Sequence, residues 1–239
     1  MTPEAGSVAP PVLRPAPRPA LGQLALCEFI ATALLLIAVV GSGIMAERLR
    51  GGNVAKALLG NSIATGGALV ALILTFGPVS GAHMNPAVTI ASMLADGLPR
   101  RIAGTYIAAQ IVGGFVGVWI AHVMFEVPVL QIGQHVRTGS GQWVAEAVAT
   151  FGLLAVIWGC RAHAASLTAV AVAAYITGAY WFTASTSFAN PAVTLARALT
   201  DSFAGIRPLD APGFIAAQAA GLLIALPLLR GMLGRRNPR

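Results

Sequence analysis

The chain has 239 residues, of which 56% are hydrophobic and only 10% are charged, and its mean hydropathy is +0.77. This composition excludes an ordinary soluble domain and is typical of a protein that lies in a membrane. The net charge of +7 comes from basic residues scattered over short loops and the two tails, which argues for contact with anionic lipid and against nucleic-acid binding.

Six stretches are predicted to cross the membrane as helices, because about 20 apolar residues span the hydrocarbon layer. They lie near residues 21–44, 57–78, 101–125, 142–160, 165–186 and 211–230. The proline-rich residues 1–20 lack the apolar core of a signal peptide and are expected to form a disordered tail. More Lys and Arg residues fall on the N-terminal side of the membrane than on the other side, which predicts that both tails are cytoplasmic.

Two nearly identical hexapeptides predict short helices inside the membrane. Residues 84–89 read Met-Asn-Pro-Ala-Val-Thr and residues 189–194 read Ala-Asn-Pro-Ala-Val-Thr. In both, asparagine can cap a helix whose first residue is proline, so the predicted helix starts are Asn85-Pro86-Ala87 and Asn190-Pro191-Ala192. Helix starts expose unpaired N–H groups and a partial positive charge, and at membrane depth they mark a pore or a binding site.

The two halves of the chain repeat the same features in the same order. Glu28 near the start of the first span corresponds to Glu146 in the fourth, and Gln110 in the third span corresponds to Gln218 in the sixth. Because each repeat crosses the membrane three times, the second repeat is inverted relative to the first. The predicted fold is an all-α membrane protein with six transmembrane helices and two re-entrant half-helices that meet at the midplane. The predicted parts are a cytoplasmic tail, a first repeat, a connecting loop, a second repeat and a basic cytoplasmic tail, over residues 1–20, 21–125, 126–140, 141–230 and 231–239.

These features resemble the aquaporin and aquaglyceroporin (major intrinsic protein) family over nearly everything from residue 21 to residue 229. The two Asn-Pro-Ala signatures in a six-span layout carry the resemblance, together with Glu28 and the stretch from Ser80 to Asn85. The resemblance implies a homotetramer in which each protomer has its own pore for small uncharged molecules. It also implies that Glu28 and Glu146 hold the loops before the half-helices, although intramembrane carboxylates could instead form a proton relay.

The paired asparagines predict how the centre of such a pore selects its solutes. Their amide N–H groups can donate to a passing oxygen and replace part of its hydration. The facing positive helix ends oppose protons and metal ions, so the centre should pass neutral molecules.

The resemblance further assigns a second constriction to four residues at fixed spacings from the asparagines. These are Thr65, Gly178, Ser187 and Val193. Most relatives have arginine where Val193 stands, so this small, uncharged set predicts a wide filter without arginine. Bacterial relatives with valine at this position resemble the branch associated with arsenic handling.

Two neighbouring features leave this assignment open. Arg197 lies one helical turn after the valine, where it either adds positive charge to an outer vestibule or pairs with Asp201 or lipid phosphate. Tyr180 and Trp181 lie close to Gly178, and a small error in helix register would place an aromatic ring in the constriction.

The sequence favours a passive channel in a bacterial inner membrane. The expected solutes are arsenous acid and related metalloid hydroxides, glycerol-like polyols, urea and water. The alternatives are a water and glycerol facilitator without a metalloid role, a proton-coupled secondary transporter, which inverted repeats also build, and an ion channel. The expected partners are these solutes, the lipid bilayer and other copies of the chain. No catalytic residue, metal site, cofactor or nucleic acid is expected.

Overall fold

The structure, a computed structural model, describes residues 19–233, and its helices match the predicted all-α fold. Six helices are long and apolar enough to cross a membrane: α1 (Leu21–Leu49), α2 (Val54–Ser80), α4 (Arg100–Met124), α5 (Ser140–Cys160), α6 (Ala165–Phe182) and α8 (Ala211–Leu233). Two short helices, α3 (Pro86–Ala95) and α7 (Pro191–Arg197), and a 3-10 turn, η1 (Pro208–Asp210), complete the fold. The predicted fold class is confirmed. Most of each predicted tail, residues 1–18 and 234–239, lies outside the described residues.

Both short helices begin where the hexapeptides predict. Asn85 and Asn190 are the N-caps, each with extended backbone, and proline is the first helical residue in both cases. The side-chain oxygen of Asn85 accepts from the N–H of Ala87 at 2.8 Å, and that of Asn190 accepts from the N–H groups of Ala192 and Val193 at 3.0 and 3.2 Å. These bonds satisfy first-turn donors that would otherwise be unpaired at a helix start.

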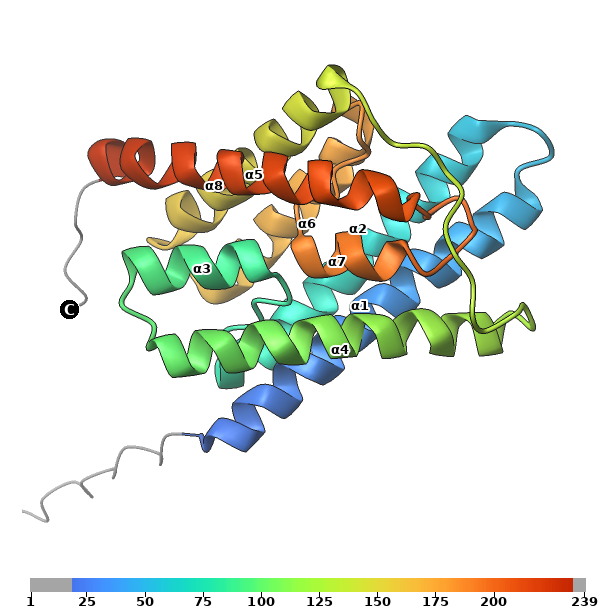
Figure 1. Cartoon of the computed structure of the whole chain (residues 1–239). Helices are drawn as coiled ribbons and strands as arrows, with labels where there is room; N and C mark the ends of the chain where they lie inside the picture. The colour runs from blue at the N-terminus through green and yellow to red at the C-terminus, as the bar shows by residue number, and fades with distance from the viewer. Residues whose placement is uncertain (1–18, 234–239) are drawn as a thin grey trace, which may run out of the picture.

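The helices pack in two similar sets. In the first half α1 contacts α2 and α4, and in the second half α5 contacts α6 and α8. The halves interlock because α7 contacts α4 as well as α8, and α3 contacts α8 as well as α4. Figure 1 shows α3 and α7 lying end to end between α4 and α8, with their N-terminal ends facing each other. The start of α1 and the end of α8 lie at the same end of the bundle, as an even number of crossings requires.

Glycines allow the closest helix contacts in both halves. A Cβ atom on Gly113 or Gly117 of α4 would collide with the backbone carbonyl of Phe29 or Ala33 in α1. A Cβ atom on Gly221 of α8 would collide in the same way with the carbonyl of Ala147 in α5. Such small residues let membrane helices approach closely enough for backbone packing to hold them together.

We expect Gly117→Ala to lower the stability of the folded protein. The added methyl group would collide with backbone atoms of α1, and a change of side-chain rotamer cannot relieve that collision. Overpacking of this kind costs about 1–3 kcal/mol, which corresponds to a fall of a few degrees in the unfolding temperature. Thermal unfolding in detergent measures the effect. The matched control is Gly104→Ala on the same helix, where a Cβ atom meets open space. Equal unfolding temperatures for the two variants would contradict close packing at Gly117.

Candidate functional site

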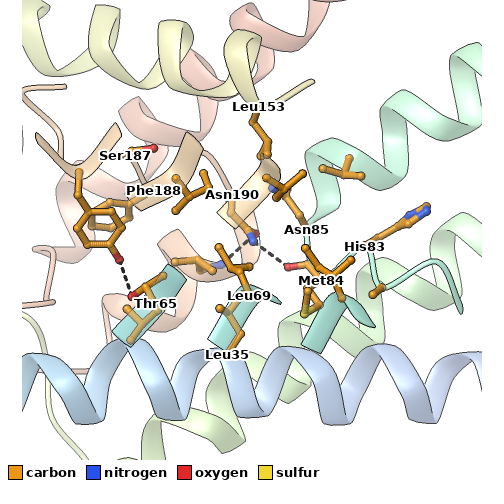
Figure 2. A pocket seen from close by; sticks show the side chains of 18 of the residues that line it. Leu35, Thr65, Leu69, His83, Met84, Asn85, Leu153, Ser187, Phe188 and Asn190 are labelled. Atoms are coloured by element: carbon orange, nitrogen blue, oxygen red, sulfur yellow. Dashed lines mark hydrogen bonds between the residues drawn. The ribbon is translucent and has the colours of Figure 1, made fainter. Parts of the chain in front are cut away.

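The starts of the two half-helices are joined by a reciprocal pair of hydrogen bonds. Nδ2 of Asn85 donates to the carbonyl oxygen of Ala189 at 2.8 Å, and Nδ2 of Asn190 donates to the carbonyl oxygen of Met84 at 2.7 Å. Figure 2 shows the two asparagines side by side at this junction. Because an amide nitrogen carries two hydrogens, each asparagine keeps one N–H group for a further acceptor.

A cavity of about 80 Å³ passes this junction, and both asparagines line it. This volume accommodates several water molecules. We call the end beside Thr65 and Ser187 the outer end and the end beside His83 the inner end (Figure 2). Most of the remaining wall is apolar and includes Leu35, Val39, Leu69, Ile73, Val88, Leu153, Val172 and Ile176. Polar groups are therefore few and concentrated at the junction and at the two ends.

Glu28 holds the loop before α3. Its side chain is completely buried, and its two oxygens accept hydrogen bonds from the hydroxyl of Ser80, the backbone N–H groups of His83 and Met84, and Nε2 of Gln110. The four distances lie between 2.7 and 2.9 Å. Ala82 and Met84 in this loop have φ of 48°, a left-handed conformation that side chains disfavour. The carboxylate thus stabilises a loop whose backbone conformation is unfavourable for residues with side chains.

Glu146 occupies the equivalent place in the second half. It is also completely buried and accepts from the backbone N–H groups of Phe188 and Ala189 at 2.8 and 2.9 Å and from Nε2 of Gln218 at 2.6 Å. Ser187 and Ala189 have φ of 50° and 47°, matching the loop before α3. Since both carboxylates are occupied by protein donors, this geometry favours a role in holding the loops over a proton relay.

Two threonines, which the sequence analysis did not single out, complete these networks. Oγ1 of Thr89 accepts from Nε2 of Gln110 and donates to the carbonyl of Asn85, at 3.0 Å in both cases. Thr194 bonds Gln218 and the carbonyl of Asn190 in the same way, at 2.9 and 2.8 Å. The signal was present, because each hexapeptide ends in threonine.

Three of the four residues assigned to the second constriction line the outer end of the cavity. They are Thr65, Ser187 and Val193. Gly178 does not line it: a Cβ atom there would lie 3.7 Å from the ring of Phe182, a side chain that is 59% exposed on the outside of the bundle. Tyr180 lines the cavity instead, and its hydroxyl lies 3.2 Å from Oγ1 of Thr65.

The structure therefore places Tyr180, and not the expected Gly178, in the wall at this end of the cavity. Each residue turns an α-helix by about 100°, so two residues two positions apart face nearly opposite sides. Trp181, the second aromatic residue that the sequence placed close to Gly178, donates from Nε1 to the hydroxyl of Ser62 and is 49% exposed. A tyrosine, and not a glycine, thus contributes to the wall of the outer end.

Arg197 also lines the cavity, together with Val193. Its side chain is buried, Nε donates to the carbonyl of Ala204, and the guanidinium carbon lies 3.4 Å from the centroid of the Phe188 ring. No ion pair with Asp201 is found among the described residues, and that carboxylate instead accepts from the N–H of Gln134 at 3.3 Å. Of the two possibilities left open by the sequence, the structure favours the vestibule.

Two half-helices that meet head to head among six helices long and apolar enough to cross a membrane, with a cavity at their junction, are the architecture of a membrane channel. A comparison with protein-family profiles agrees with a membrane channel and identifies the family. The profile described as major intrinsic protein matches residues 18–167, and the chain belongs to this family. The resemblance inferred from the paired Asn-Pro-Ala signatures is confirmed.

Individual relatives agree with this placement. The chain is 49% identical to aquaglyceroporin AqpS of Rhizobium meliloti (strain 1021) over 219 residues, which cover 91% of this chain and 93% of that protein. It is 36% identical to probable aquaporin PIP2-8 of Oryza sativa subsp. japonica over 51% of this chain and 41% of that protein. The X-ray structure of the aquaglyceroporin from Plasmodium falciparum has the same fold, with a TM-score of 0.70 at 18% identity, covering 90% of this chain and 97% of that one.

The place of Tyr180 in the wall can be tested by widening the outer end. We expect Tyr180→Ala to raise glycerol permeability by about 10-fold, the size of effect that a change in pocket shape produces. Water permeability should rise less. The reason is that the ring occupies lumen that a glycerol-sized solute needs. Stopped-flow light scattering on reconstituted vesicles measures both rates. Gly178→Ala is the control and should change neither rate, whereas a larger effect from Gly178→Ala would restore the original assignment.

Proposed function

We propose that this protein is a passive channel for small neutral solutes, with Asn85 and Asn190 at its midplane. The observation that carries the proposal is the reciprocal bonding of the two asparagines, which leaves each with one amide donor at a cavity whose wall is otherwise mostly apolar. A solute hydroxyl can exchange water for these donors at little cost, while an ion has no counter-charge there to replace its hydration shell. The positive ends of α3 and α7 add to the barrier against cations.

The proposed solutes are water, glycerol-like polyols, urea, and neutral metalloid hydroxides, above all arsenous acid. Val193 supports a lumen for polyols because it is small and apolar where most relatives carry arginine. Hydroxyl groups of Thr65, Tyr180 and Ser187 supply donors and acceptors that suit a solute with several hydroxyls. The name of the relative AqpS, an aquaglyceroporin, supports the polyol part of the proposal.

We further propose that the protein lies in a bacterial inner membrane as a homotetramer, with both ends of the chain in the cytoplasm. Large apolar side chains that are exposed on the outside of the bundle support a lipid or protomer contact there, among them Leu26, Ile63, Val112, Val144 and Leu223. Mass measurement of the detergent-solubilised protein tests the number of copies.

The experiment that tests the function compares vesicles with and without the purified protein. Shrinking and swelling rates are measured for water, glycerol and urea, and uptake is measured for arsenous acid at a pH where it is neutral. We expect all four to cross at rates that rise linearly with concentration and ignore a proton gradient. Saturable uptake driven by a proton gradient would contradict a channel, and selective failure of arsenous acid would leave a water and glycerol facilitator.

A further inference from the structure

Two buried guanidinium groups lie on one aromatic ring at the outer end of the cavity. Arg197 is 1% exposed and Arg137, from the segment between α4 and α5, is 5% exposed. Their guanidinium carbons lie 3.4 and 5.1 Å from the centroid of the Phe188 ring. Among residues 19–233, the ion pairs within 4 Å involve other arginines. Both charges therefore lie at the channel mouth without a carboxylate partner.

The two groups are held by neutral acceptors, which fix their positions without cancelling their charge. Nε of Arg137 donates to the carbonyl of Gly205 at 2.8 Å, and its Nη atoms donate to the carbonyls of Ser185 and Phe203, both at 3.3 Å. Burial and then repulsion from Arg197 lower the pKa of Arg137 to about 9, so the group is still charged at pH 7. Both arginines consequently contribute positive charge at the outer end.

Arg197 differs from Arg137 because it forms part of the cavity wall. Its Cα lies one turn after Val193 on α7, and helical side chains lean toward the N-terminus of their helix. The guanidinium lies over the ring of Phe188, and both residues line the same cavity as Val193. Nearby, the hydroxyl of Ser187 is buried, lines the same cavity and has no hydrogen-bond partner in the described part of the chain. A hydroxyl without a partner and a guanidinium in the wall of one cavity can both bind a solute oxygen.

We infer that Arg197, which lies on the Phe188 ring as Arg137 does, is the charge-selecting residue at the outer end of the cavity and keeps cations and protons out of a lumen lined there by the uncharged Val193. This inference rests on the proposed channel function. As an order of magnitude, a positive charge about 6 Å from a cation at an effective dielectric constant of about 20 lowers the local cation population about 100-fold. It costs a neutral solute little and offers that solute hydrogen-bond donors.

Removing this charge while keeping the length of the side chain tests the inference. We expect Arg197→Met to raise the ratio of proton flux to water permeability at least about tenfold, with proton flux measured by a pH-sensitive dye inside proteoliposomes and water permeability measured on the same vesicles. Arg197→Lys keeps the charge and should keep the barrier. The matched control is Arg101→Met, which removes a positive charge from an exposed residue outside this cavity and should leave the proton flux unchanged.

A proton flux for Arg197→Met equal to that of the wild type, with normal water permeability, would overturn the inference and leave the channel function intact. Vesicles in which the wild-type protein passes no neutral solute would overturn the proposed function and the inference with it. If Arg197→Met does not fold, Val193→Glu gives the same test, because a glutamate four residues before an arginine pairs with it across one helical turn. Proton flux should then exceed that of Val193→Gln, and equal fluxes would overturn the inference.

Discussion

Val193→Arg should cut glycerol permeability by about 10-fold to 100-fold, within the range that a change of pocket shape produces, and water permeability by much less. Val193 lies in the wall of a cavity of only about 80 Å³, together with Tyr180 and Arg197. The longer side chain adds bulk at the narrow outer end, and a second guanidinium one turn from Arg197 also raises the local positive charge. A water molecule is small enough to pass beside both groups, whereas a three-carbon polyol is not.

The measurement is the ratio of glycerol to water permeability in the same vesicles, so that differences in protein content cancel. Val193→Met is the matched control, because it lengthens the side chain without adding charge or a planar fork of donors, and it should lower the ratio only slightly. The double variant Val193→Arg with Arg197→Met should recover part of the glycerol flux, since residues in one cavity couple. An equal loss of water and glycerol permeability would contradict the place of Val193 in the constriction.

Glu28→Gln should destabilise the fold by about 2–5 kcal/mol and thereby remove the channel. Four donors converge on the two oxygens of Glu28 within 2.9 Å, and the carboxylate is completely buried. A glutamine keeps one oxygen and offers an NH₂ group in place of the other, so donor faces donor. Since His83 and Met84 donate to different oxygens of Glu28, one of these two N–H groups then loses its acceptor in a buried place, and the left-handed loop before α3 is less well supported.

Thermal unfolding in detergent and water permeability of vesicles should fall together in this variant. Glu126→Gln is the control, because Glu126 is an exposed residue and its replacement should change neither quantity. Glu146→Gln should reproduce the effect in the second half, where three donors converge in place of four. A Glu28→Gln protein with unchanged stability and no flux would instead support proton coupling through this carboxylate.

The sequence by itself determined the two half-helices and the six spans. Asn85 and Asn190 cap helices through bonds to residues two or three positions away, and proline at the next position fixes the backbone, so these starts follow from short-range chemistry. The spans follow from composition, because only a continuous apolar helix satisfies its backbone in lipid. The matching positions of Glu28 and Glu146 could also be found, since both halves repeat one pattern.

Only the tertiary structure decided which side chains occupy the outer end of the cavity. Tyr180 rather than Gly178 faces it because the rotation of α6 is set by packing against α2 and α5, and an error of two residues reverses the face. The positions of Arg197 and Arg137 depend on carbonyls of residues 203–205 in the loop after α7. A long, flexible side chain adopts the conformation in which distant backbone offers acceptors, and no local pattern encodes where those acceptors will lie.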